Sequence, residues 1–272
     1  MLNKYQYKDR DYITDILNAK KFTSKFFSTE LKLLSRHYRE LGCNEVEIKN
    51  RLHEFCKRGM KKYNPAIHYK IINNAVSHGM NEHNKIVQID SLTVSLPELN
   101  YIDTLELSHE YKRVVFTLLV LQRLFRSYLQ IKDGETKSNE YYFGGYKNYR
   151  DLVSVAKITF DKRKKSKVKN IHDLVRLLHE KEIVEIANNG NIKLLFMYDI
   201  PTDDSNGIIV KEYNEIGYYY DLFHGENRVK ECESCGVPIR PNGNRQEFCK
   251  VCSKQNELEK YRKYNKTRIN HR

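Results

Sequence analysis

At residues 232–252 the chain carries Cys232-Glu-Ser-Cys235-Gly236 and then Cys249-Lys-Val-Cys252, the strongest pattern in its 272 residues. Each is a Cys-x-x-Cys pair, and thirteen residues separate the second cysteine from the third. Four thiolates at this spacing are typical of a structural zinc site, where a tetrahedral ion closes a module too small to bury its own core. We therefore predict one structural Zn²⁺ bound by all four cysteines. A redox-active pair is the alternative, but no thioredoxin-like pattern surrounds it.

The segment between the two pairs predicts a compact finger. Gly236 lets the first knuckle turn tightly, and Pro241-Asn242-Gly243-Asn244 predicts a turn between two short strands. We expect a helix from Ser253 to Tyr264 to follow the second pair, because a helix N-terminus favours thiolate charge.

This order of knuckle, hairpin and helix resembles a treble-clef zinc finger or zinc ribbon. Arg245 and Phe248, just before the second pair, are similar to residues of short zinc modules in phage and mobile-element proteins. Some treble-clef proteins are nucleases with catalytic histidines. No histidine lies between Cys232 and Asn270, so the resemblance implies no catalytic residue here.

A basic tail with interleaved tyrosines follows the last cysteine. Lysine and arginine side chains that leave a zinc module in this way suit contact with phosphates. The alternative is a solvated terminus. We predict nucleic-acid contacts for Lys260, Arg262, Lys263, Lys266 and Arg268.

The formal net charge of +13 is unevenly distributed. Residues 157–169 hold seven basic residues and one acid, whereas residues 170–230 hold six basic and eleven acidic residues. A generally lysine-rich composition would not concentrate charge in this way. The clusters therefore indicate a polyanionic partner.

The middle of the chain predicts three helices and a hairpin. Helices are expected at 105–131, 149–158 and 168–181, and a β-hairpin at 183–198 around an Asn/Gly-rich turn. This order resembles a winged helix-turn-helix, which implies that the last helix enters the major groove and the hairpin follows the backbone. The alternative is an ordinary small α+β domain with a solvated connector. Because the chain concentrates positive charge just before the last of these helices, we predict phosphate contacts for the basic connector: Lys162, Arg163, Lys164, Lys165, Lys167 and Lys169.

The first 79 residues predict helices with clear boundaries. Gly42 ends one helix, Asn44 and Glu47 form a capping box for the next, and Asn64-Pro65 starts another. The stretch from Leu31 to Val76 resembles the small helical domain that follows primase cores in phage and plasmid replication proteins. No primase core precedes it here, so no polymerising activity is implied.

The complete sequence predicts a mainly α fold with small β-hairpins. Its expected parts are a helical domain (1–79), a linker with extended pieces (80–103), a winged-helix-like domain (104–198), an acidic irregular linker (199–230) and a four-cysteine zinc module with a basic tail (231–272). The six cysteines do not form a secreted disulfide pattern, and the apolar run at 114–121 is too short for a membrane span. We expect a cytoplasmic protein without membrane contact.

These features predict a DNA-binding accessory protein of a phage or mobile element that acts in replication or transcription control. The expected partners are double-stranded DNA and replication or transcription proteins, and no catalytic residue is predicted. One alternative is a fragment of a nucleic-acid-processing enzyme, nuclease-like or primase-like, which would need a clustered metal site. Another is a protein-interaction adaptor that uses zinc for stability alone.

Overall fold

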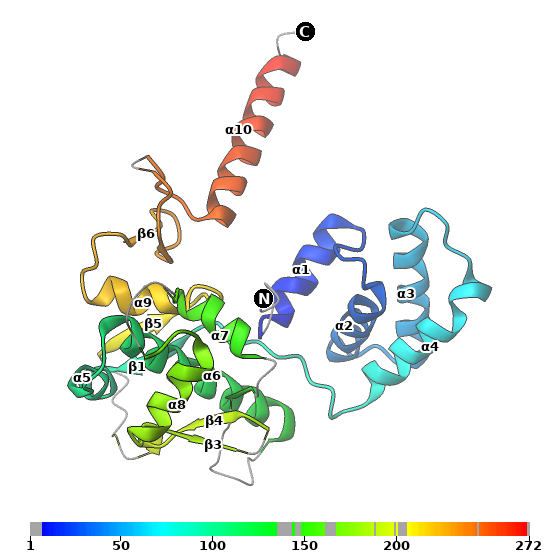
Figure 1. The fold of residues 1–272 in the computed structure, drawn as a ribbon. Helices are drawn as coiled ribbons and strands as arrows, with labels where there is room; N and C mark the ends of the chain where they lie inside the picture. Colours follow the sequence, from blue (N-terminus) through cyan, green and yellow to red (C-terminus); the bar gives the residue numbers. More distant parts are fainter. Residues whose placement is uncertain are drawn as a thin grey trace. The chain divides into compact units, whose positions relative to one another are not determined.

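The fold is mainly helical, and its described residues form three small antiparallel sheets (Figure 1). The structure is a computed structural model. It divides into two compact units: the described residues of Asn3–Asp90 with Leu124–Asn139, called here the N-terminal unit, and those of Ser91–Arg123 with Glu140–Arg272, called the second unit. The structure describes residues 7–134, 143–144, 148–160, 167–187, 189–198, 200, 206–243 and 245–270.

The N-terminal unit is built on four helices. The second of them packs along the fourth and also contacts the first and the third. Their inward faces bury one apolar cluster, which includes both of the cysteines outside the C-terminal pairs. Cys43, which directly follows the turn at Gly42, is therefore a core residue. The helices are α1 (Asp9–Ala19), α2 (Phe27–Glu40), α3 (Glu45–Gly59) and α4 (Pro65–Met80).

The predicted helix boundaries in this unit are confirmed. Gly42 follows α2 with φ 82°, a left-handed conformation that glycine adopts at little cost. Asn44 accepts a hydrogen bond from the Glu47 N–H at 3.0 Å, and the Glu47 carboxylate accepts one from the Asn44 N–H at 2.9 Å. Asn64 caps α4, with Pro65 in its first turn. Local capping chemistry alone sets these ends.

Both segments expected to be linkers contain a strand and a helix. The extended piece expected within 80–103 is confirmed as a strand, whereas the segment at 199–230 is not irregular throughout. The segment at 80–103 holds β1 (Leu92–Ser95) and the start of α5 (Leu96–Thr104). The segment at 199–230 holds β5 (Gly207–Val210) and α9 (Ile216–Phe223). The two strands pair antiparallel, with Ser95 opposite Gly207. A methyl group added at Gly207 would lie 2.1 Å from the Val94 carbonyl oxygen, so only glycine fits there.

The middle of the second unit contains the predicted helices and hairpin. The helices are α6 (His109–Asp133), whose residues from Leu124 onward belong to the N-terminal unit, α7 (Tyr149–Ala156) and α8 (Ile171–Glu180). Helix α8 packs on the first hairpin strand. The hairpin consists of β3 (Val184–Ile186) and β4 (Asn191–Leu194), which confirms that prediction, although Phe196–Tyr198 form a 3-10 turn. A further strand, β2 (Phe143–Gly144), pairs with β4, which gives the sheet order β2-β4-β3.

The long helix α6 supplies the core of the second unit. The eight residues from Val114 to Leu121 are all buried, at 0–3% exposure. By length and composition α6 could cross a membrane, but 56% of its most apolar window is buried within the protein. Length and composition alone are therefore weak evidence that α6 spans a membrane.

The C-terminal region begins after α9. Two short strands, β6 (Lys230–Glu231) and β7 (Pro238–Ile239), pair antiparallel on either side of the first cysteine pair. The helix α10 (Lys250–Asn270) begins at the second pair and is longer than predicted at both ends. One strand of the module, β7, packs on α9.

Candidate metal centre and nucleic-acid surfaces

The four cysteines of the two pairs lie together. Their sulfur atoms are all within 4.8 Å of one another, and the Sγ atoms of Cys235 and Cys249 are 3.8 Å apart. A tetrahedral zinc ion with bonds of about 2.3 Å places its sulfurs about 3.8 Å apart, whereas a disulfide needs about 2.05 Å. All four thiols are free. The cluster therefore has the donor set and the spacing that a structural metal ion requires.

Backbone hydrogen bonds shape the first knuckle and join it to the second. The Gly236 N–H donates to the Cys232 carbonyl at 2.8 Å, and the Cys232 N–H donates to the Val237 carbonyl at 2.9 Å. The Cys249 N–H, at the start of α10, donates to the Cys232 sulfur at 3.2 Å. Burial opposes ionisation of the Cys232 thiol, but N–H donors from residues 249, 234 and 235 lower its pKa to about 6. Burial and the neighbouring thiols instead raise the pKa of Cys235 to about 12, and burial raises the pKa of Cys249. Cys232 is therefore the thiol of these three that ionises most readily.

The strand pair of the module differs from the prediction. We expected two strands around the turn at residues 241–244, between the cysteine pairs. The structure instead pairs β6 and β7 across the knuckle of Cys232 and Cys235, with Glu231 opposite Pro238. Within the described residues between the two pairs, β7 is the single strand. The hydrogen bonds of the knuckle close this tighter hairpin.

A buried carboxylate joins α9, the helix that leads into the module, to α6. The Asp221 side chain is 6% exposed and receives a hydrogen bond from Arg113 at 2.7 Å. The His109 Nε2 atom lies 3.0 Å from the same carboxylate. Sequence analysis missed this site, because residues 108 positions apart give no local signal.

A second polar group lies around another carboxylate, that of Asp103 in α5. The Tyr220 hydroxyl donates to Asp103 at 2.6 Å, and the His224 Nε2 atom lies 3.3 Å from the same carboxylate. Burial is the largest cause that raises the pKa of Tyr220, and its bond to Asp103 adds to it. These partners satisfy one another, so the group has the character of a structural tie between α5, α6 and α9.

The predicted basic connector lies mostly outside the described residues. Lys167 and Lys169 are described, and both are exposed just before α8. The remaining four predicted contacts lie outside the described residues: Lys162, Arg163, Lys164 and Lys165.

The exposed face of α8 carries three cationic or titratable side chains. His172, Arg176 and His179 are exposed and spaced four and three residues apart, which places them on one side of the helix. Side-chain nitrogens of Arg176 lie 3.7 Å from a carboxylate oxygen of Asp173 and 3.9 Å from one of Glu180. This face is polar and exposed, and its net charge is small.

The tail helix α10 presents part of the second predicted basic surface. Lys260 and Arg262 are exposed, and Tyr261 is 65% and Tyr264 64% exposed beside them. The side chains of Lys263, Lys266 and Arg268 are outside the described residues, although their backbone belongs to α10.

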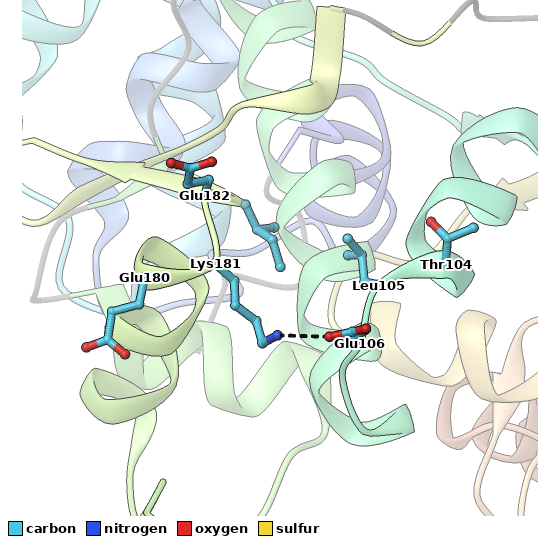
Figure 2. A pocket seen from close by; sticks show the side chains of 7 residues that line it. Thr104, Leu105, Glu106, Glu180, Lys181 and Glu182 are labelled. Atoms are coloured by element: carbon cyan, nitrogen blue, oxygen red, sulfur yellow. Dashed lines mark ion pairs between the residues drawn. The ribbon is translucent and has the colours of Figure 1, made fainter.

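One surface cavity of about 390 Å³ lies between the α5–α6 connection and the end of α8. Figure 2 shows the Lys181 side chain directed at Glu106, with an N–O distance of 3.7 Å. The lining also includes Glu180 and Glu182, so acidic groups outnumber the single lysine. An acidic lining disfavours the binding of phosphate groups in this cavity.

Comparison with known proteins gives one informative similarity. No family model matches the chain, and no solved structure matches it. Over 52 residues the chain is 45% identical to a protein named DNA-directed RNA polymerase YonO of Bacillus phage SPbeta. The match covers 19% of this chain and 6% of that protein. The chain thus spans a small fraction of this relative and shares a short segment with a phage protein.

Proposed function

We propose that this chain is a DNA-binding accessory protein of a phage or mobile element that acts in transcription or replication control. It would bind duplex DNA through a winged-helix module, and a zinc ion would hold its C-terminal module together. The observation that carries the proposal is the element order α6-β2-α7-α8-β3-β4 with the sheet order β2-β4-β3.

The order of elements supports a winged helix in a specific way. A strand between the first and second helices pairs with the second strand of the hairpin, and the third helix packs against the first strand. In a winged helix this arrangement leaves the outer face of the third helix uncovered, and that helix enters the major groove of DNA. That helix would be α8, with Arg176 and His172 on its exposed face.

The surfaces around α8 support contact with phosphates. Lys167 and Lys169 lie exposed at its N-terminal side, where the helix dipole also favours anions. The four predicted basic residues that precede them would add to this field. Binding would then come mainly from phosphate contacts and would fall steeply with salt.

The zinc module supports the same reading. Four thiolates can hold a zinc ion, and α10 leaves the site with exposed basic and tyrosine side chains. Tyrosine rings stack on bases, and lysine and arginine pair with phosphates. We propose that the described residues Lys260 and Arg262 belong to a second contact, together with Lys263, Lys266 and Arg268.

The phage relative supports a role near transcription. The relative is named as a DNA-directed RNA polymerase, and the shared segment is short. The same name is the one observation in favour of a second candidate, a fragment of a nucleic-acid-processing enzyme. Among the described residues, the four cysteines are the single group of three or more ligand side chains close enough to hold a metal. We propose binding as the function for this reason.

The test is a salt-dependent binding titration. Lys167→Ala with Lys169→Ala should weaken binding to every duplex sequence, and the slope of log K against log salt should flatten by about one unit for each lost phosphate contact. Fluorescence anisotropy with labelled duplexes measures both. The control is Lys211→Ala with Arg228→Ala, which removes the same charge from exposed positions elsewhere in the second unit.

An unchanged affinity and slope in the Lys167/Lys169 variant would contradict the winged-helix proposal. A magnesium-dependent polymerase or nuclease activity of the pure chain, lost on substitution of its carboxylates, would favour the enzyme instead.

A further inference from the structure

Two connections of the N-terminal unit meet at the end of α3. A methyl group added at Gly59 would lie 3.2 Å from the Lys21 Cα and 3.7 Å from the Lys20 carbonyl oxygen. The α1–α2 connection therefore runs directly beside the C-terminus of α3. The α3–α4 connection begins at the same place. Residues that are about forty positions apart in sequence thus form one surface.

This surface is strongly basic, and we call it the basic end. Its six cationic side chains are all exposed. Glu54 pairs with one of them, Lys57, at 2.6 Å, and no described carboxylate forms an ion pair with the other five. Residues 55–81 contain five basic residues and no acid. The members of the basic end are Lys20, Lys21, Lys57, Arg58, Lys61 and Lys62.

The backbone beneath the basic end is held in place. Glu30 is fully buried and accepts hydrogen bonds from the N–H groups of Thr23 and Ser24 and from the Tyr12 hydroxyl, at 2.7–3.2 Å. The Phe22 ring packs edge-on against the Phe55 ring of α3, with 5.1 Å between the two ring centres. The backbone of the α1–α2 connection is therefore held in place before a partner binds, so its ordering adds little to the free-energy cost of binding.

Helix electrostatics explains only part of this arrangement. Lys57 and Arg58 lie in the last turn of α3, where cations are favourable. The lysines of the two connections lie outside α3, so its dipole gives no comparable reason for their position. Gathering six like charges disfavours the folded state, unless an anion neutralises them.

The helix that ends at this surface has an exposed polar face. Four residues join α2 to α3, with Gly42 at φ 82° among them, which is the connection of a helix-turn-helix. Asn50 and Arg51 are exposed on α3, and Glu47 and Glu54 are exposed about one turn before and after them. The Arg51 guanidinium also lies over the Tyr38 ring, 5.3 Å from its centre. Asparagine and arginine are side chains that pair with adenine and guanine edges in the major groove.

We propose that the N-terminal unit is a second DNA-binding module, in which α3 enters the major groove of duplex DNA and the basic end contacts its phosphates. The proposal goes beyond the function assigned to the second unit, because it concerns different residues in a different compact unit. Duplex DNA is the expected partner because a helix that can contact base edges and a basic end that can contact phosphates occur together.

The experiment uses the full chain and a short fluorescein-labelled duplex of random sequence. Lys61→Ala with Lys62→Ala should weaken binding several-fold and flatten the salt slope by about one unit per lost phosphate contact. Arg10→Ala with Lys85→Ala is the matched control, because both residues are exposed basic side chains away from the basic end. Circular dichroism melting of each variant tests that the fold is retained.

A second variant tests base reading. Arg51→Lys keeps the charge but removes the planar fork that pairs with guanine. Binding to random duplex should stay within about twofold of wild type, while preference for a duplex selected by the wild-type chain from a random pool should fall about tenfold, as loss of one bidentate base contact predicts.

Two outcomes would overturn the proposal. One is a folded Lys61/Lys62 variant that binds duplex with the affinity and salt slope of the wild type. If the Lys167/Lys169 variant nevertheless binds more weakly than the wild type, the function proposed for the second unit stands, and only the second DNA-binding module is contradicted. The other is tighter binding of single-stranded RNA than of duplex by the wild-type chain, lost in the Lys61/Lys62 variant. Weakening in the Lys61/Lys62 variant alone would support the second module and contradict the winged helix.

Discussion

Cys249 connects the two halves of the four-cysteine cluster. Its sulfur lies 3.8 Å from that of Cys235 and 3.4 Å from the Cys252 backbone nitrogen, while its own N–H donates to the Cys232 sulfur. The module around it buries very few apolar side chains. Metal binding would therefore supply much of its folding free energy.

We predict that Cys249→Ser releases the metal and unfolds residues 231–265, while the N-terminal unit stays folded. Metal analysis of the pure protein should find one zinc per chain in the wild type and much less in the variant. Hydrogen exchange would locate the unfolding. The control is Cys56→Ala, because burial raises the pKa of the Cys56 thiol to about 12 and keeps it a neutral core group. Wild-type protein without stoichiometric metal would show that the zinc prediction is wrong.

At the scale of elements, the second unit depends on ties between helices that are distant in sequence. The Arg113 side chain is 12% exposed and bonds both to Asp221 of α9 and to the Lys157 carbonyl after α7. One guanidinium thus joins three helices. Breaking a buried pair of this kind is costly, because it leaves a charge without a counter-charge.

We predict that Asp221→Asn lowers the free energy of unfolding by about 1–3 kcal/mol, because an amide cannot neutralise the Arg113 guanidinium. Urea unfolding followed by circular dichroism measures this difference. Glu226→Gln is the matched control, since it also removes one carboxylate near His109 but at a half-exposed position. It should change the free energy by less than about 0.5 kcal/mol. Equal effects of the two substitutions would argue against a structural tie at Asp221.

At the scale of the whole molecule, acid should affect the N-terminal unit through three histidines. Burial is the largest cause that lowers the pKa values of His37, His53 and His78 from 6.5. The unfolded chain therefore binds protons more readily than the folded unit. Their stabilising contribution is complete above pH 6.5 and is lost as the pH falls from there through the lowered folded pKa values.

We predict a lower melting temperature of the N-terminal unit at a pH of about 5.5 than at about 7.5. His78→Gln should reduce that difference, because it removes a group whose protonated form is opposed by burial and by the nearby Arg36. Circular dichroism melts at the two pH values make the comparison, and a pH difference as large in the variant as in the wild type would count against it.

The sequence by itself determined the features that rest on short-range chemistry. The capping box at Asn44, the left-handed Gly42 and the hairpin after α8 depend on neighbouring residues, so their patterns predicted them correctly. The four metal-ligand candidates also follow from spacing, because a Cys-x-x-Cys knuckle places two sulfurs together without help from the rest of the fold.

The tertiary structure alone decided which distant segments meet. The two segments expected to be linkers form a sheet, because the backbone N–H and C=O groups of β1 and β5 pair with one another. Neither strand could satisfy these groups alone. Helix packing also brings Asp221 into contact with Arg113 and places Lys21 beside Gly59, although each pair is far apart in sequence. Such meetings depend on the shapes of whole buried faces, and no local pattern of residues encodes them.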